Sequence, residues 1–147
     1  RKGTLLREEA DKFGYVYNSR APYQVIANDF MPAPELIKIK DIARVTGLYT
    51  GTEDFAQSLP RIFRDTSVKP YTFFQGLTEF IYRNDLMKKT GIKENLYRIL
   101  YAYAQGQYDS SNETLKLQVL MDVIHDDLEN SMSPEDVKKF DRKGWEL

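Results

Sequence analysis

Apolar residues recur at helical spacing through most of the chain after residue 33. The clearest stripe follows Pro70 and has the spacing of a buried helix face: Phe73, Phe74, Leu77, Phe80 and Ile81. Similar stripes predict a helix from Pro34 to about Tyr49, one opened by Thr52-Glu53-Asp54, one around Leu96, Ile99, Leu100 and Tyr103, one after a Ser110-x-x-Glu113 capping box, and a short last one from Pro134. We therefore predict a mainly α fold, with an irregular or orthogonal bundle of about six helices over residues 34–147.

Glycine and proline positions refine the expected helix boundaries. Gly47 and Gly51 are expected to break the first of these helices, and Pro60 is expected to kink or split the second. In the last helix, Val137 and Phe140 share a face and are expected to fold back onto the core.

Residues 1–33 have a different pattern. Thr4 is a plausible N-cap for a short helix over residues 5–13, and Gly14 is a plausible stop. Residues 15–17 and 21–26 are rich in aromatic and β-branched side chains, which favours extended structure. We predict that residues 1–33 form an extended arm with one short helix, in front of a helical domain at 34–147.

Composition narrows the classes of function. The 147 residues suffice for one domain with a core, and 21 basic against 22 acidic residues do not favour binding to nucleic acid or to an anionic membrane surface. The chain has no Cys, which excludes disulfides and an iron–sulfur cluster held by its own thiolates. The longest apolar runs are too short to cross a bilayer, and the composition fits a reducing cytoplasm.

The sharpest local candidate for chemistry is Asp122-x-x-His125-Asp126-x-x-Glu129, whose members share one helix face. An acid and a His three residues apart occur in di-iron bundles, but such sites need a second acid–His helix, and His125 is the one His of this chain. A solvated acidic stripe is the favoured interpretation, and a small metal-dependent enzyme around Asp122 and His125 is the weakest alternative. We assign no catalytic residue and no metal ligand.

Three tyrosines on and after the fourth predicted helix are candidates for a groove or a partner surface. Tyr97, Tyr101 and Tyr108 can line such a groove, because a phenol tolerates half-burial. The edge of the core is the favoured interpretation, since the basic residues nearby are scattered and do not interleave with the rings.

Four stretches, taken together and in order, resemble one known junction. They are Lys2-Gly3-Thr4-Leu5-Leu6-Arg7-Glu8-Glu9-Ala10, Gly14-Tyr15-Val16-Tyr17, Ala21-Pro22-Tyr23-Gln24-Val25-Ile26 and Glu35-Leu36-Ile37-Lys38-Ile39-Lys40-Asp41-Ile42. The resemblance is to the region just past the barrel in cobalamin-binding-domain radical S-adenosylmethionine proteins, some of which are labelled magnesium-protoporphyrin IX monomethyl ester oxidative cyclases. It is recognisable over residues 1–63, and Ala21 and Gln24 depart from the commoner Pro and Glu.

The resemblance implies a three-part parent enzyme. An upstream Rossmann-like cobalamin-binding domain and a partial barrel with Cys-x-x-x-Cys-x-x-Cys would precede this chain, which starts at Arg1 without an initiator Met and is expected to be a fragment. The parent would use a [4Fe–4S] cluster and S-adenosylmethionine, with cobalamin as a further candidate, whereas this fragment would hold no cofactor. It would be an accessory domain that packs on or covers the barrel and is not catalytic alone.

The same resemblance names residues for two roles. Gly3, Thr4 and Arg7 would lie closest to the active site of the parent. Contacts with the upstream barrel would be made by Tyr15, Tyr17, Pro22, Tyr23 and Val25. The alternative is a freestanding helical module that binds another protein. If the arm docks on a barrel, the isolated chain exposes an apolar patch, and we expect it to form a homodimer.

Overall fold

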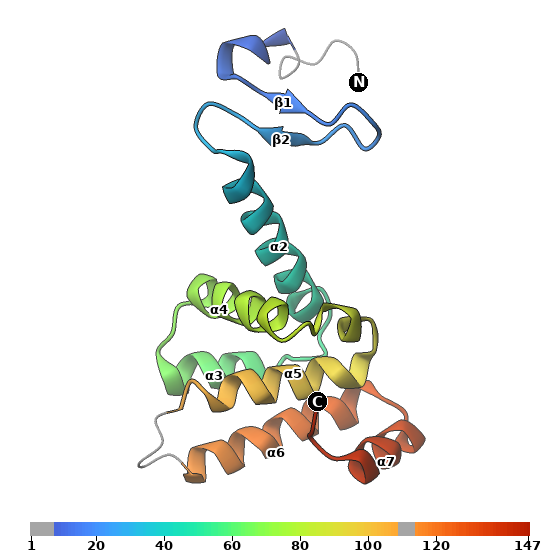
Figure 1. Ribbon diagram of the computed structural model, residues 1–147. Coiled ribbons are helices and arrows are strands. Elements are labelled where there is room, and N and C mark those ends of the chain that lie inside the picture. Colours follow the sequence, from blue (N-terminus) through green and yellow to red (C-terminus); the bar gives the residue numbers. More distant parts are fainter. Residues whose placement is uncertain (1–7, 109–113) are drawn as a thin grey trace. The chain divides into compact units, whose positions relative to one another are not determined.

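The computed structural model describes residues 8–108 and 114–147, and these are mainly helical (Figure 1). The α-helices are α2 (Ala33–Thr50), α3 (Ser58–Thr66), α4 (Pro70–Arg83), α5 (Lys93–Gln105), α6 (Thr114–Ser131) and α7 (Pro134–Lys143). Two 3-10 helices, η1 (Asp11–Phe13) and η2 (Met87–Gly91), and two strands, β1 (Val16–Tyr17) and β2 (Val25–Ala27), complete the described elements. The predicted mainly α class is confirmed.

The chain divides into two compact units, Arg1–Ala43 and Arg44–Leu147, which we call the N-terminal unit and the helical unit. Helix α2 begins in the first unit and ends in the second.

The N-terminal unit contains an antiparallel hairpin. Val16 of β1 lies opposite Ala27, and Tyr17 lies opposite Val25. Gly14 precedes β1 with a φ of 59°, a left-handed conformation that favours glycine. The extended stretches predicted at residues 15–17 and 21–26 are therefore confirmed in part, as the two strands of one hairpin. The predicted helix at residues 5–13 begins outside the described residues, and its last three residues form η1.

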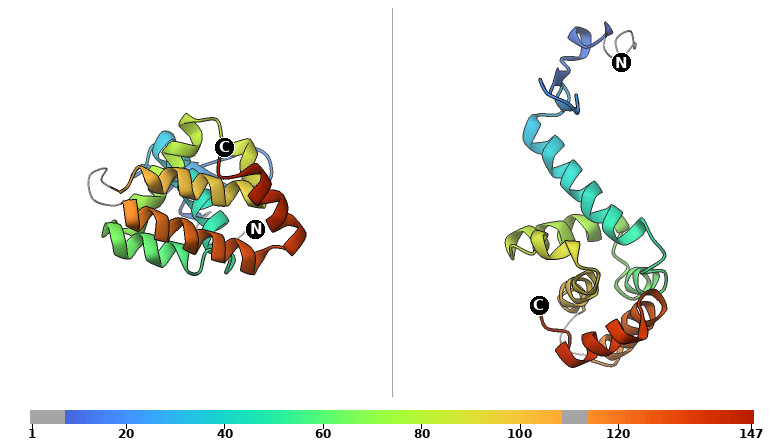
Figure 2. Two further views of the ribbon diagram at one scale, coloured as in Figure 1. Left: turned by 90° about the horizontal axis from the view of Figure 1, so that it is seen from below. Right: turned by 90° about the vertical axis from the view of Figure 1, so that its right-hand side faces the viewer.

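The helical unit packs around α5 and α6, which lie side by side in both views (Figures 1 and 2). Helix α3 packs on α6, α4 packs on α5, and α7 folds back on α6. The largest buried apolar side chains come from every α-helix of this unit and from the turn before α3: Tyr49, Phe55, Ile62, Phe73, Leu77, Ile81, Tyr97, Ile99, Leu100, Leu120, Ile124 and Phe140. This core is the one that the apolar stripes predict.

The proline rules hold at two helix starts. Pro70 and Pro134 occupy the first turns of α4 and α7, where the missing N–H has no helical partner to lose. At α7 the Ser133 side chain also caps the helix by accepting from the backbone N–H of Asp136. Val137 and Phe140 are buried, so the expected return of this helix onto the core is confirmed.

Three predictions about helix boundaries are wrong. Gly47 lies inside α2, so it does not break the helix, which ends at Thr50 before Gly51. The next helix begins at Ser58, not at Thr52. Pro60 therefore falls in the first turn of α3 and neither kinks nor splits it, because N–H groups of a first turn have no intrahelical acceptor. The Ser110–Glu113 capping box lies outside the described residues.

The first half of α2 also departs from its predicted stripe. Ile42 and Val45 are buried, but Ile39 and Ala43, from the same predicted face, are exposed. Ile37, which does not belong to that stripe, is exposed as well.

Candidate functional site

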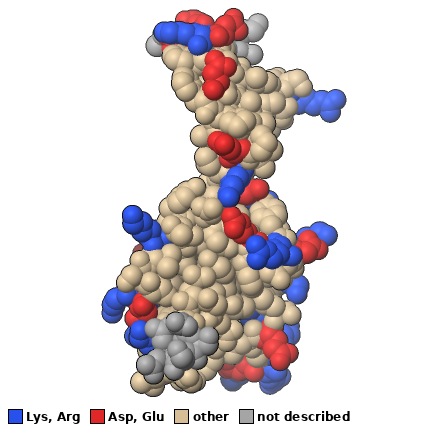
Figure 3. Space-filling model, turned by 60° about the vertical axis from the view of Figure 1, so that its left-hand side comes forward, with Lys and Arg blue, Asp and Glu red and all other residues tan. Residues whose placement is uncertain are grey.

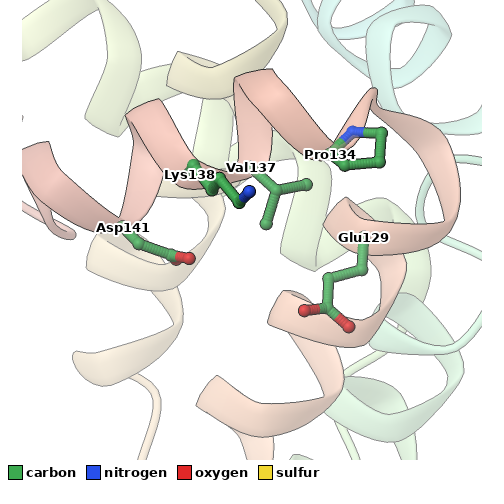
Figure 4. Close-up of a pocket in the computed structure, with 5 residues that line it drawn as sticks. All are labelled: Glu129, Pro134, Val137, Lys138 and Asp141. Carbon is green, nitrogen blue, oxygen red and sulfur yellow. The ribbon is translucent and has the colours of Figure 1, made fainter.

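The predicted acidic stripe meets α7 at His125. Its Nε2 lies 2.9 Å from Oδ1 of Asp141 on α7, and its Nδ1 lies 3.6 Å from Oε1 of Glu129 on α6. Glu129 and Asp141 also line a pocket of about 380 Å³ together with Pro134, Val137 and Lys138. Figure 4 shows the two carboxylates on opposite sides of this opening, with Val137 between them on α7.

This geometry limits what His125 can do. Both of its ring nitrogens face carboxylates, so neither is directed at the pocket as a proton donor or acceptor for a substrate. Asp122 accepts from Nε2 of Gln118 on its own helix, at 3.3 Å. It does not join the carboxylates of Glu129 and Asp141 at His125. Within residues 8–108 and 114–147, no group of three or more His, Cys, Asp or Glu is placed to hold a metal ion. His125 therefore links α6 to α7, and Asp122, Asp126 and Glu129 are exposed, as the stripe interpretation predicts.

A polar cluster joins the 51–57 turn to α5 and α6. The Tyr97 hydroxyl donates to the Asp54 carbonyl at 3.1 Å and lies 2.5 Å from Oγ of Ser131. Nζ of Lys93 pairs with Oδ1 of Asp54 at 2.8 Å and donates to the Ser131 carbonyl at 3.0 Å.

Lys, Tyr and Ser side chains take part in acid–base chemistry in many enzymes. In this cluster, the raised pKa of Tyr97 and the ion pair of Lys93 favour a structural role. Burial raises the pKa of Tyr97 to about 12, and the hydrogen bond from Ser131 lowers this pKa only in part. The Lys93 ammonium is held by a carboxylate. Tyr97 is thus a neutral hydrogen-bonding group in the core, and Tyr108 is also buried, which confirms the core interpretation for both.

Asp127 is a polar residue that the pattern of charges did not single out. Its carboxylate is 4% exposed and accepts from the backbone N–H of Ser58 at 2.8 Å, the Ser58 hydroxyl, and the backbone N–H of Gln57. These groups lie at the start of α3, where backbone donors lack helical partners. Its position seven residues after Leu120 and three after Ile124 places it on the apolar face of α6, and that was the signal available in the sequence.

Arg98 is a second buried charge, 6% exposed, on α5. Its Nε donates to the Gly144 carbonyl at 2.8 Å, and its guanidinium carbon lies 4.2 Å from the ring centre of Phe140. Within the described part of the chain, Nη2 of Arg98 is buried without a hydrogen-bond acceptor. Burial lowers the pKa of Arg98, while Glu94 opposes this effect. The contacts hold α7 and the segment after it against α5.

The visible face of the helical unit carries its charges mainly at the margins (Figure 3). Lys, Arg, Asp and Glu are mixed there around a broad uncharged area. Charge therefore does not mark a site on this face.

The N-terminal unit exposes apolar side chains to solvent instead of burying them in a core. Tyr23 is 63% exposed and Pro22 is exposed, while Tyr15, Tyr17 and Val25 are half-buried. Among the described residues eleven large apolar side chains are exposed, and six of these belong to the N-terminal unit: Val16, Tyr23, Ile26, Phe30, Ile37 and Ile39. No residue from 8 to 41 is buried. The candidates Gly3, Thr4 and Arg7 lie outside the described residues.

Aromatic rings form a row along this unit. Phe30 lies 6.5 Å from Phe13, Phe13 lies 5.9 Å from Tyr15, and Tyr15 lies 6.3 Å from Tyr17, measured between ring centres. Sequence reasoning found the two tyrosines but not Phe30, because a single Phe in a polar loop carries no periodic signal.

The structure thus defines a mainly α domain with a hairpin at its N-terminal end. The most unusual surface of this domain is formed by the exposed apolar side chains of the N-terminal unit. The chain belongs to the family described as Protein of unknown function (DUF4080), whose model matches residues 11–146. The match includes both the hairpin and the helical unit. No curated protein and no solved structure matches the chain. Among the described residues, no helix combines the length and the apolar character needed to cross a bilayer.

Proposed function

We propose that this chain is the C-terminal accessory domain of a radical S-adenosylmethionine enzyme with an upstream cobalamin-binding domain. In this proposal the N-terminal unit docks on the barrel of the same protein, and the helical unit packs on or covers the barrel. The [4Fe–4S] cluster and S-adenosylmethionine belong to the parent enzyme, and Gly3, Thr4 and Arg7 are the residues of this chain nearest to its active site.

The observation that carries the docking part is the lack of buried residues between positions 8 and 41. Burial of apolar surface contributes about 25 cal/mol per Å², and an ordered segment without it has little to offset its lost conformational entropy. A two-stranded hairpin is marginal by itself in water. The six exposed apolar side chains of this unit therefore favour a second protein surface that covers them.

The resemblance over residues 1–63 supports the choice of partner. Its four stretches occur in the order and spacing of the junction after a radical S-adenosylmethionine barrel, and three of them lie wholly or mainly in the described N-terminal unit. A docking surface directly after a barrel is placed to contact that barrel. Chain connectivity also raises the effective concentration of the two parts.

The first test is the reading frame upstream of the Arg1 codon. The proposal expects an in-frame Cys-x-x-x-Cys-x-x-Cys motif at a distance that leaves room for a barrel. A start codon close to Arg1 would overturn it and would favour the alternative, a freestanding helical module that uses the same apolar surface to bind another protein.

The covering role has a separate test in the intact enzyme. A lid that excludes water protects a radical intermediate from side reactions. Deletion of residues 34–147 is expected to lower substrate turnover while cleavage of S-adenosylmethionine continues without coupling to substrate. Unchanged, fully coupled turnover after this deletion would rule out the lid and leave only a supporting role.

A further inference from the structure

A cavity of about 370 Å³ lies between the end of α5 and the segment that follows α7. Of the three tyrosines considered for a groove, Tyr97 and Tyr108 are buried, whereas Tyr101 is half-buried and lines this cavity. The lining consists of two aromatic, two apolar and two polar side chains: Tyr101, Trp145, Ala102, Leu147, Gln105 and Glu146. The volume falls in the lower part of the range of small-molecule sites.

The wall that follows α7 is held in a defined position. Gly144 ends the helix with a φ of 72° and a ψ of −167°, a conformation that is essentially restricted to glycine. Its carbonyl accepts from Nε of Arg98 at 2.8 Å. The Trp145 ring then packs on Phe140 and Tyr101, with ring centres at 5.0 and 4.9 Å. The aromatic part of the lining is therefore fixed by contacts outside the cavity.

Among the described residues, the lining has one carboxylate and no Lys or Arg side chain. Glu146 is exposed, and within residues 8–108 and 114–147 its carboxylate forms no hydrogen bond or ion pair. The basic neighbours lie outside the lining. Arg142 and Lys143 are exposed on the last turn of α7, and Arg98 donates to the Gly144 carbonyl. The charge that the lining offers to a ligand is therefore negative.

The two rings add an attraction of the same kind. The face of an aromatic ring is electronegative and attracts a cation within about 6 Å of the ring centre, most strongly for Trp. Within the described part of the chain, Lys and Arg side chains lie over Phe13 and Phe140, but none lies over Tyr101 or Trp145. The rings of this lining are therefore not already paired with a cation of the chain.

We propose that this cavity binds a small organic cation of the substituted-ammonium class, beside the rings of Tyr101 and Trp145 and the carboxylate of Glu146. Rings and a carboxylate together complement both the alkyl groups and the charge of such a cation. An anionic ligand would face Glu146 without a basic partner in the lining. The cavity belongs to the helical unit alone, so the inference is independent of the proposed function.

The single Trp of the chain makes the site directly observable, because its indole N–H gives one signal in a proton–nitrogen correlation NMR spectrum. The probe is choline chloride, titrated into the 147-residue chain, with sodium chloride at equal ionic strength as the reference. A saturable shift of the Trp145 signal is expected with choline and not with sodium. The absence of a saturable shift up to about 50 mM choline overturns the site.

Two comparisons isolate the role of charge. The uncharged analogue of choline, with a quaternary carbon in place of nitrogen, is expected to bind roughly fivefold more weakly or worse. Equal affinity for the two compounds would show an apolar cavity without preference for a cation and overturns the inference.

The second comparison concerns the carboxylate. Glu146→Gln is expected to weaken choline binding roughly two- to fivefold, as for an exposed ion pair. The matched variant Glu135→Gln changes an acid in the first turn of α7, at the other end of that helix, and is expected to leave the affinity unchanged. Equal affinities of the two variants would show that Glu146 does not contact the cation, which also overturns the inference.

Discussion

At the scale of single residues, buried charges determine how two distant segments meet. Asp127 on α6 receives three hydrogen-bond donors from Gln57 and Ser58, about seventy positions earlier in the chain. The start of α3 has no side-chain cap of its own, so the carboxylate of Asp127 serves that purpose from another helix. The sequence could not reveal this, because a cap from a distant element has no local motif.

Replacement of Asp127 by Ala is expected to lower the free energy of unfolding by roughly 2–4 kcal/mol, because buried donors then lose their acceptor. The neighbouring Asp126 is exposed, and Asp126→Ala is expected to change the free energy of unfolding by about 0.5 kcal/mol or less. Urea unfolding of both variants measures the difference. Equal losses in the two would show that the cap contributes little.

Buried phenols make the fold sensitive to alkali. Burial raises the pKa of Tyr49 and Tyr103 above the ordinary value of 10.0 and raises that of Tyr97 to about 12. Between pH 10 and 12 the unfolded chain therefore releases phenolic protons that the folded chain still holds. The unfolded state binds fewer protons there, so the free energy of unfolding falls as the pH rises.

The corresponding variant is Tyr97→Phe. Each phenol contributes a slope of up to about 1.4 kcal/mol per pH unit within its window, so removal of Tyr97 is expected to make the loss between pH 10 and 12 less steep. The variant starts from a lower stability at pH 8, since it lacks the hydrogen bonds to Asp54 and Ser131. Urea midpoints measured from pH 8 to 11.5 test this, and an unchanged slope would contradict it.

At the scale of elements, the helices are largely predictable from the sequence. Whether a glycine within a helix can be replaced by a larger residue depends instead on the packing around it. Gly76 on α4 faces Tyr103 of α5, and an added Cβ would lie 2.1 Å from the phenol oxygen. The Tyr103 ring is held by Phe73 and Phe80, with ring centres at 5.2 and 5.6 Å. It therefore has little freedom to move aside. Gly47 on α2 has open space around the same position.

The two glycines form a matched pair for mutation to alanine. Gly47→Ala is expected to raise the free energy of unfolding by about 1 kcal/mol, the difference in helix propensity. Gly76→Ala gains the same propensity but is expected to lower the free energy of unfolding by about 1–2 kcal/mol, because the clash with Tyr103 outweighs it. Thermal unfolding of both variants measures these changes. Stabilisation by Gly76→Ala would contradict the prediction and show that the Tyr103 ring moves aside at little cost.

Prolines illustrate the same division between local and distant causes. Pro70 and Pro134 begin helices as the sequence predicts, because the rule for a first turn involves only nearby backbone. The sequence predicts that Pro60 lies inside a helix, but it lies in the first turn of α3. The acids after Thr52 are typical of a first turn and predict a helix start there, whereas α3 begins at Ser58, where Asp127 accepts from the backbone.

At the scale of the whole molecule, the buried core belongs almost entirely to one unit. Every buried apolar residue of the described chain except Ile42 lies in the helical unit. Removal of residues 1–32 is therefore expected to leave the thermal midpoint of this unit within a few degrees of that of the full chain. Calorimetry of the truncated chain measures it. A large drop would show that the N-terminal segment contributes to the stability of the core.

The sequence by itself determined the mainly α class, the extended character of the segment around residues 15–26, the apolar faces of four helices and the acidic stripe at Asp122. These depend on periodicity and on residues close in the chain, which local backbone geometry converts directly into structure. The parent enzyme stays a proposal, since family membership describes no activity.

Only the tertiary structure decided which polar groups meet. It placed Asp127 at the start of α3, Tyr97 beside Ser131, and His125 against Asp141, because each pair joins elements whose distance in space no local pattern encodes. It also showed that Ile37 and Ile39 are exposed. The physical reason is that the burial of a side chain depends on the elements that surround it. A sequence pattern indicates only which side chains are apolar and are stabilised by burial.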